Sequence, residues 1–131
     1  MRGLRQRKDA LEELVSLLSD INNYVGVVVV EGVRDVSSLK ALGCKALIEV
    51  LDHSGVSDYD LVEEIASKHG SVLILTDFDE EGLSLNQRFT NLFERKGAKV
   101  ETGLRRQVGR LMARIGVYAI ESLDNVMADL E

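Results

Sequence analysis

Three carboxylates follow two of the most apolar stretches of the chain, and their position suits a hard metal ion. Glu31 comes directly after four consecutive valines at 27–30, and Asp77 and Asp79 come after the apolar run 72–76. Carboxyl ends of neighbouring parallel strands meet at one edge of a sheet, so these acids are expected to converge there. A like-charge pair about 4 Å apart costs roughly 1 to 4 kcal/mol, which a divalent cation offsets directly.

The types of these side chains indicate which cation would suit them. Oxygen-only ligands without a cysteine or histidine cluster favour Mg²⁺, with Mn²⁺ as the second choice, over Zn²⁺. In the sequence Asp77-Phe78-Asp79 the two acids project to the same side of an extended segment, and Phe78 points the other way and can anchor the loop in the core. Gly32 and Gly82 supply backbone freedom beside the acids.

Hydrophobic periodicity predicts alternating helices and strands around these acids. Strands are expected where short apolar runs are bounded by turn residues, and helices where apolar residues recur every three or four positions. The predicted strands are 25–30, 46–50, 72–76 and 98–101, with the last at a sheet edge. The predicted helices are 4–21, 35–42, 58–69, 81–96, 104–114 and 120–130, the second capped by Asp35 or Ser37 and the third by Ser57 or Asp58.

This alternation predicts an α/β fold with a mostly parallel central sheet of about four strands and helices on both faces. The 131 residues are expected to form one domain, and 45% apolar content is enough for a core. Cys44 is the single cysteine, which excludes an internal disulfide and fits a reducing compartment. No apolar run approaches 18 residues, so the expectation is a cytoplasmic protein without a membrane span.

The net charge of −6 is unevenly distributed. Residues 9–81 contain sixteen acids and four bases, whereas residues 88–114 contain eight bases and two acids. Arg106, Arg110 and Arg114 recur every four residues, and with Arg105 they are candidates for binding a nucleic-acid backbone. A solvated or salt-bridged helix face explains the same pattern equally well.

The two acidic motifs together resemble the Toprim domain. Glu31-Gly32 matches its glutamate motif, Asp77, Asp79 and Gly82 match the DxDxxG motif, and Asp35 matches an acid common in the maturase-like members. The resemblance covers a core at 25–101, between an N-terminal helix at 1–24 and a basic plus a C-terminal helix at 102–131. Toprim domains occur in topoisomerases, DnaG-type primases and the ribonuclease that matures 5S ribosomal RNA, and the chain looks most like small stand-alone members.

The resemblance implies metal-dependent chemistry on phosphodiester bonds. It implies that Asp77 and Asp79 hold Mg²⁺ (or Mn²⁺), that Glu31 is a ligand or a general acid/base, and that Asp35, Gly32 and Gly82 support them. The chain departs from common family patterns at three places, namely Phe78 in place of proline, Leu83 in place of glutamate and Asn86 in place of a basic residue. These departures concern the reaction more than the fold.

The favoured function is nuclease-type cleavage or processing of RNA or DNA. A non-catalytic Toprim module that binds metal and nucleic acid within a larger complex is the alternative, and a protein partner or a homo-oligomer remains open. A haloacid-dehalogenase-like phosphatase also begins with a strand and DxD, but it needs a later lysine and acidic pair. The strand end at Glu101-Thr102 has no acidic pair after it.

Overall fold

A computed structural model describes residues 3–130 and shows a four-stranded sheet in which every strand pair is parallel. The strands are β1 (Val27–Val30), β2 (Ile48–Val50), β3 (Ser71–Ile74) and β4 (Lys99–Val100). Their order is β2-β1-β3-β4, so β1 and β3 are the central pair and β4 is an edge strand, as predicted. In the β1–β3 register Val29 is opposite Ile74, which brings the two strand ends that precede the acids next to each other.

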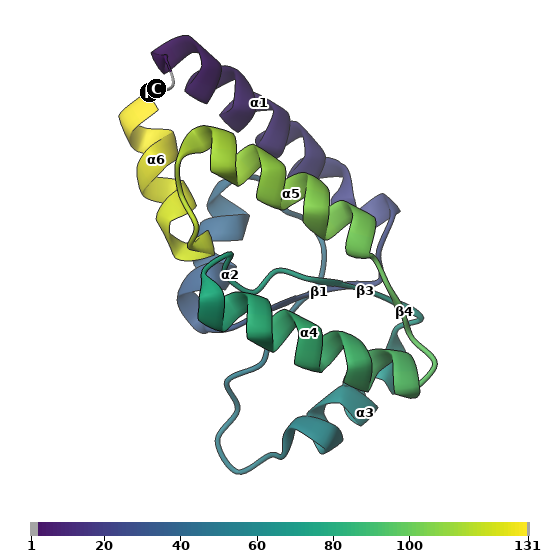
Figure 1. Ribbon diagram of the computed structural model, residues 1–131. Coiled ribbons are helices and arrows are strands. Elements are labelled where there is room, and N and C mark those ends of the chain that lie inside the picture. Colours follow the sequence, from purple (N-terminus) through teal and green to yellow (C-terminus); the bar gives the residue numbers. More distant parts are fainter. Residues whose placement is uncertain (1–2, 131) are drawn as a thin grey trace.

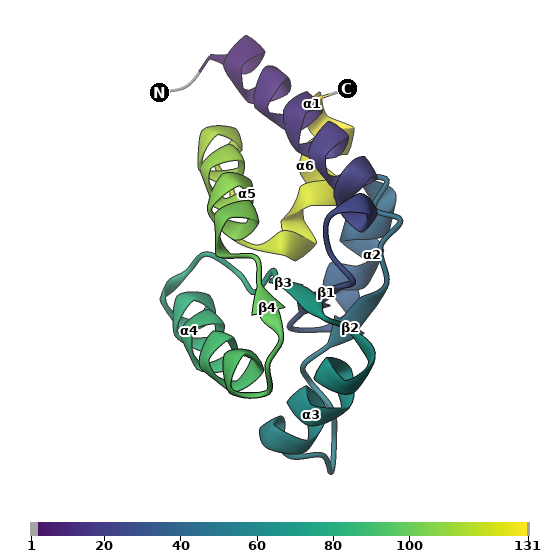
Figure 2. The same ribbon diagram turned by 90° about the vertical axis from the view of Figure 1, so that its right-hand side faces the viewer.

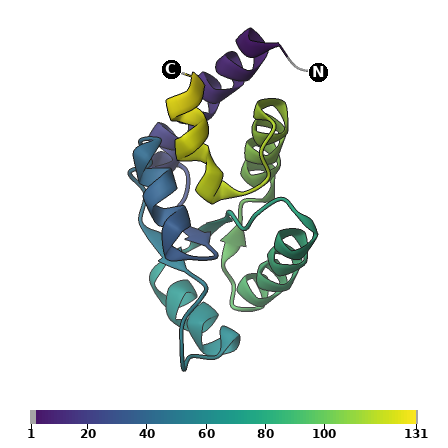
Figure 3. The ribbon, with the colours of Figure 1, turned by 90° about the vertical axis from the view of Figure 1, so that its left-hand side faces the viewer.

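Helices cover both faces of the sheet (Figures 1 and 2). The α-helices are α1 (Leu4–Asp20), α2 (Val33–Ala41), α3 (Asp58–Lys68), α4 (Glu80–Arg95), α5 (Thr102–Ile115) and α6 (Leu123–Leu130), with short 3₁₀ turns η1 (Ile21–Asn23) and η2 (Ile120–Ser122). α3 and α4 pack on one face, whereas α1, α2, α5 and α6 pack on the other, where α6 lies beside α1 and α2 (Figure 3).

The four valines of β1 show why the sequence of a central strand is continuously apolar. Val28 and Val30 belong to the core under α1, α2, α5 and α6, and Val27 and Val29 belong to the core under α3 and α4. All four side chains are fully buried, because successive residues of a strand point to opposite faces and both faces here carry helices. The parallel α/β prediction is therefore confirmed.

The predicted elements are all present, with small shifts at their ends. Ser57 caps α3 as expected and accepts a hydrogen bond from the backbone N–H of Asp60 at 3.1 Å. The start of α2 differs, because Gly32 is its N-cap residue rather than Asp35 or Ser37. Asp35 instead lies in the first turn, and its Oδ2 accepts a hydrogen bond from the Gly32 N–H at 3.0 Å.

Within residues 3–130, none of the helices combines the length and the apolar content needed to cross a membrane. The proposed division into an N-terminal helix, a core and a C-terminal part stays a prediction. Residues 1, 2 and 131, which that division includes, lie outside the described residues.

Candidate metal centre

The ends of β1 and β3 are joined by a direct hydrogen bond between the two acidic motifs. One carboxylate oxygen of Glu31, Oε2, accepts from the backbone N–H of Asp77 at 2.7 Å. The two residues are 46 positions apart, and the adjacency of their strands brings them together. Glu31 thus faces the loop that carries Asp77, as the spacing of the motifs predicts.

Asp79 has a capping role that the motif spacing did not predict, and its role as a metal ligand stays a prediction. It is the N-cap residue of α4, and its Oδ1 accepts from the Gly82 N–H at 2.8 Å. It does not line the pocket that contains Glu31 and Asp77. An aspartate directly before a helix is well suited to capping the exposed N–H groups, and this local interaction turns its carboxylate toward α4.

Gly82 is required here for close packing. A Cβ added to Gly82 would lie 2.0 Å from the carbonyl oxygen of Asp77, so only glycine permits the first turn of α4 to approach this loop. The buried hydroxyl of Thr76 donates to the Gly82 carbonyl at 2.7 Å and keeps the first turn of α4 close to this loop. Gly32 differs, because a Cβ there would meet nothing within 4 Å, so the space beside Glu31 is open.

The C-terminal part of the chain also holds Asp77 in place. Its Oδ1 accepts from the backbone N–H of Ile120 at 2.9 Å, and the N–H of the next residue, Phe78, donates to the Tyr118 carbonyl at 2.8 Å. Residues 117–122, called the C-terminal strap below, therefore fix the loop that carries Asp77.

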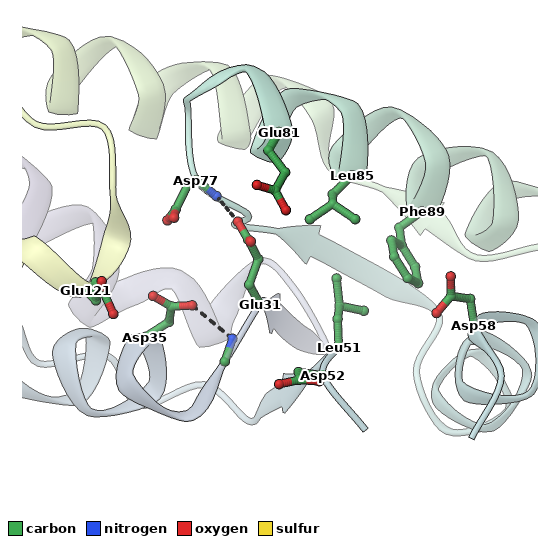
Figure 4. Close-up of a pocket in the computed structure, with 11 residues that line it drawn as sticks. Glu31, Asp35, Leu51, Asp52, Asp58, Asp77, Glu81, Leu85, Phe89 and Glu121 are labelled. Carbon is green, nitrogen blue, oxygen red and sulfur yellow. Dashed lines mark hydrogen bonds between the residues drawn. The ribbon is translucent and has the colours of Figure 1, made fainter. Parts of the chain in front are cut away.

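An open pocket of about 470 Å³ lies between these elements (Figure 4). Seven of its eleven lining residues are acidic and none is basic. The acidic ones are Glu31, Asp35, Asp52, Asp58, Asp77, Glu81 and Glu121. We call it the acidic pocket. Asp58 at its far end is paired with Arg88 across 2.6 Å, whereas Glu31, Asp35 and Asp77 cluster where β1, β3 and α2 meet.

Burial and mutual repulsion disfavour ionisation of the central carboxyls. Desolvation raises the pKa of Glu31, and the charges of Asp77, Asp35 and Asp79 raise it further, against the lowering effect of the Asp77 N–H. The pKa of Asp77 is raised by burial and by the charges of Asp79 and Glu121, and it is lowered in part by the Ile120 N–H. Burial likewise raises the pKa of Asp35. A bound cation would relieve this repulsion.

The residues fit a hard divalent cation in chemical type. Glu31 and Asp77 each use one carboxylate oxygen for a backbone N–H and leave the other without a hydrogen bond to residues 3–130. In that same range no three acidic, histidine or cysteine side chains are already arranged as a metal-binding group. Mg²⁺ is commonly held by one or two carboxylates while it keeps several waters, so the pair Glu31 and Asp77 is sufficient for this type of site.

Arg105 does not belong to the exposed basic face. Its side chain is buried and donates to the carbonyl oxygens of Ile74 at 3.1 Å, Thr76 at 2.9 Å and Asp77 at 3.3 Å, while it stacks on the Phe78 ring with 4.2 Å to the ring centre. Burial lowers its pKa to about 10, against the opposing effect of Glu31 and Asp77. Arg105 therefore supports the loop from beneath, where its guanidinium is paired with three carbonyl oxygens. Its contact with a nucleic-acid backbone stays a prediction.

The other three arginines of α5 remain accessible. Arg106 and Arg110 are exposed, and Arg114 is partly exposed, with Glu13 at 3.9 Å. We call these three residues the basic stripe. Arg106 also lines a second groove, of about 470 Å³, between α4 and α5. Phe78 forms a wall of this groove, so the two hollows lie on either side of the loop that carries Asp77 and Phe78.

Sequence reasoning grouped Arg105 with the exposed arginines and did not single out Glu121. Arg105 shares a helical face with Val108, Met112 and Ile115, all buried, and this spacing is a signal that Arg105 faces the core. Glu121 carries no such signal, because it reaches the acidic pocket only through the path of the C-terminal strap. Phe78 does pack against the core as predicted, and it does so over Gly109, where a Cβ would lie 2.6 Å from the ring.

Comparison with known proteins places the chain in a family. The family profile described as Toprim domain matches residues 26–102. A UPF0292 protein from Methanosarcina barkeri is 34% identical over 126 residues, which cover 96% of this chain and 86% of that protein. A UPF0292 protein from Pyrococcus horikoshii is 33% identical over 82% of this chain and 79% of its own length.

A solved structure has the same fold. A protein from Aquifex aeolicus aligns with a TM-score of 0.68 over 86% of this chain and 96% of its own length, at 24% sequence identity. The chain therefore belongs to the Toprim domain family, and its relatives are small archaeal UPF0292 proteins. Toprim domains generally bind divalent metal ions and act in nucleic-acid-related roles. Because the chain belongs to the Toprim family, Asp77 and Asp79 are assigned to the Toprim DxDxxG motif rather than to a haloacid-dehalogenase-like phosphatase motif.

Proposed function

We propose that the protein is a Mg²⁺-dependent enzyme that cleaves or processes nucleic-acid phosphodiester bonds. The proposal depends on one observation, the 2.7 Å hydrogen bond that brings Glu31 and Asp77 together in a pocket lined by seven acids and no base. A phosphate would be repelled by this pocket unless a cation neutralised it first. Carboxylates that bind a cation and, through it, a phosphate are the common arrangement for Mg²⁺.

Each side chain would have a defined task. When bound, the cation polarises the phosphodiester and lowers the pKa of a coordinated water. Asp77 would hold it through the oxygen that does not accept from Ile120, namely Oδ2. Glu31 would either share the cation through Oε1, because Oε2 accepts from the Asp77 N–H, or use Oε1 to take a proton from the attacking water.

The basic stripe supports nucleic acid as the substrate class. Arg106, Arg110 and Arg114 lie on α5, whose buried Arg105 contacts the Asp77 carbonyl, so α5 packs against the loop that carries Asp77. A backbone that runs along α5 would meet positive charge outside the pocket and reach the metal-binding loop at Phe78. Long-range attraction by the stripe offsets the overall charge of −6 at this face.

Incubation of the purified protein with labelled RNA and DNA panels tests this function. We expect cleavage with Mg²⁺ or Mn²⁺, none with EDTA, and none with Asp77→Asn, which keeps a side-chain oxygen for the Ile120 N–H. Asp129→Asn, an exposed position outside the pocket, removes the same charge and should cleave normally. Cleavage that survives EDTA or Asp77→Asn would refute the proposed chemistry.

Replacement of the basic stripe tests the nucleic-acid surface separately. The triple variant Arg106→Ala, Arg110→Ala and Arg114→Ala should bind nucleic acid more weakly and reduce the salt slope by about 2 to 3, because each phosphate contact contributes about 0.7 to 0.9. The triple variant Lys40→Ala, Lys45→Ala and Lys68→Ala removes the same charge from other exposed positions. Equal losses in both triple variants would show that only net charge matters.

A non-catalytic metal- and nucleic-acid-binding module is the second candidate. It is favoured by the arrangement of the acids, because no three acidic, histidine or cysteine side chains within residues 3–130 form a group that could hold a metal. Two-metal hydrolysis places ions about 3.5–4 Å apart and needs carboxylates for both. Metal-enhanced binding without cleavage in the same panels would support this module.

A further inference from the structure

The groove between α4 and α5 differs in chemistry from the acidic pocket on the other side of the loop that carries Asp77. Its volume is about 470 Å³, and none of the described residues that line it is acidic. Arg106 places a positive charge at its wall and forms no ion pair with residues 3–130. A hollow of this size is in the range that binds small molecules and cofactors.

Two aromatic side chains from distant parts of the chain line this groove. Phe78 comes from the loop between β3 and α4, and Tyr118 comes from the C-terminal strap. The Phe78 N–H donates to the Tyr118 carbonyl at 2.8 Å, so the two residues are adjacent. Arg105 stacks on the Phe78 ring, and Gly109 makes room for it against α5. Phe78 is therefore a fixed wall, whereas the Tyr118 side chain is 63% exposed.

A single exposed aromatic side chain is common on protein surfaces and needs no ligand to explain it. Tyr24 is such a case, because it is 64% exposed and lines a hollow that contains Glu13 and Asp20 but no described basic residue. Tyr118 differs from it, because its groove contains Arg106 and no described acid. An exposed ring beside an unpaired guanidinium suits a ligand that has both a flat π face and a negative charge.

A nucleotide has these properties. Its base stacks on aromatic rings and hydrogen-bonds through its edge, and its phosphate pairs with arginine. Asn86 supplies a side-chain amide at the groove, and its Oδ1 accepts a long hydrogen bond of 3.5 Å from the Thr90 hydroxyl. Tyr118, Asn86 and Arg106 thus provide one group each for the face of the base, its edge and the phosphate.

We infer that the groove between α4 and α5 binds one unpaired nucleotide of the substrate, beside the phosphodiester bond that is cleaved. Phe78 follows Asp77 directly, so this nucleotide neighbours the cation site. A base within a duplex is already paired and stacked, and it reaches such a groove only when it is unpaired. The inference rests on the proposed function and narrows its substrate class to nucleic acid that is single-stranded beside the cleaved bond.

Fluorescence anisotropy tests this inference with labelled single-stranded RNA and DNA and with blunt duplexes of the same sequences, in EDTA to prevent cleavage. Tyr118→Ala should weaken single-strand binding about 5- to 100-fold, in the range of one lost base–aromatic stack, and leave duplex binding unchanged. The backbone carbonyl that accepts from Phe78 stays in place in this variant. Tyr118→Phe keeps the ring and should bind as the wild type does. Tyr24→Ala, which removes an equally exposed tyrosine, is the matched control.

The salt dependence of binding separates the two contacts. Tyr118→Ala should leave the salt slope for single strands unchanged, because stacking releases no counterions, whereas Arg106→Ala should reduce it by about 0.7. If Tyr118→Ala binds both single strands as tightly as Tyr24→Ala does, the inference is refuted. A loss of equal size on the duplexes would also overturn it, because the base would then not need to be unpaired.

The same experiments distinguish failure of this inference from failure of the proposed function. Cleavage of the panels with Mg²⁺ that is unaffected by Tyr118→Ala would leave the proposed function standing and contradict the nucleotide groove. Single-strand binding that depends on Tyr118, without cleavage by the wild-type protein, would support the groove and contradict the proposed function. If the wild-type protein binds neither single strand, with EDTA or with Mg²⁺, both are wrong.

Discussion

The carboxylate of Glu31 accepts a hydrogen bond from the backbone N–H of Asp77 at 2.7 Å, and this contact joins the ends of the two central strands. The contact brings together two short motifs that are separated by 46 positions, and both motifs then line the same pocket. It also brings negative charges together in a partly buried place, where the pKa of each carboxyl is raised. The apo site is therefore electrostatically unfavourable, and this has measurable consequences.

Removal of one of these charges should stabilise the metal-free protein. Asp77→Asn keeps an acceptor for the Ile120 N–H and removes repulsion with Asp79 and Glu121. We expect the free energy of unfolding to rise by about 1 kcal/mol and Tm by about 3–5 °C. Differential scanning calorimetry in metal-free buffer measures the change, with Asp129→Asn as the control of equal charge. A lower Tm for Asp77→Asn would contradict the repulsive site.

The same raised pKa values determine how the free energy of unfolding changes with pH. The ordinary pKa values of Asp77 and Glu31 are 3.8 and 4.5, and both are higher in the folded protein. The folded state therefore retains protons that the unfolded state has released, and its stability falls as the pH rises through this interval. Asp79, Glu121 and Arg105 face Asp77, and the net effect of burial and these charges is an upward shift.

Urea denaturation between pH 4 and pH 7 tests whether the free energy of unfolding falls as the pH rises. The stability of the wild-type protein relative to Asp77→Asn should decrease as the pH rises in metal-free buffer. Saturating Mg²⁺ should reverse the difference near neutral pH, because the cation favours the ionised carboxylates. A relative stability that increases with pH in metal-free buffer would show that Asp77 is stabilised as an anion without a cation.

Two glycines near the site should respond oppositely to alanine. Gly82→Ala would place a Cβ 2.0 Å from the Asp77 carbonyl oxygen, so the loop or the first turn of α4 must shift and cation binding should be lost. Gly103→Ala, in the first turn of α5, meets nothing within 4 Å and should stabilise the protein by about 0.4–1 kcal/mol. Chemical denaturation and metal titration of both variants measure this contrast. Equal behaviour of the two would refute the close approach at Gly82.

The prediction of the fold succeeded because its signals are local. Runs such as the valines at 27–30 indicate strands buried on both faces, and the alternation of strands and helices then limits the topology. Glu31 and Asp77 were correctly expected to lie near each other because strand ends in a parallel sheet share one edge. The capping role of Asp79 was not predicted, because one residue type suits both a metal ligand and an N-cap. Its role as a metal ligand stays a prediction.

The remaining differences have two sources, a long-range contact at Ile120 and a helical periodicity around Arg105 that was given less weight than charge. Ile120 lies 43 residues from the carboxylate that its N–H contacts, and this contact determines the position of Glu121. Arg105 was grouped with the exposed arginines because the sequence there is rich in positive charge. Its neighbours along the helical face are apolar, however, and that periodicity is the better indicator of its burial.

Arg105 is expected to organise the loop rather than to bind substrate. Arg105→Lys keeps the charge, but a lysine ammonium group lacks the planar set of donors that makes the three hydrogen bonds to the Ile74, Thr76 and Asp77 carbonyls. We expect a loss of about 1.5–3 kcal/mol in the free energy of unfolding. Arg106→Lys, on the exposed neighbouring position, is the control and should leave stability within about 0.5 kcal/mol. Equal stability of the two variants would contradict a structural role for Arg105.

The most direct test of the central claim is the position of a bound cation. Crystals soaked with Mn²⁺ and measured at an energy where manganese scatters anomalously reveal that position without any assumption about activity. We predict an anomalous peak in the acidic pocket, within coordination distance of Asp77 and next to Glu31, and no such peak in Asp77→Asn crystals. A peak elsewhere on the protein, or an equally strong peak in the variant, would contradict the claim that Glu31 and Asp77 form a metal centre.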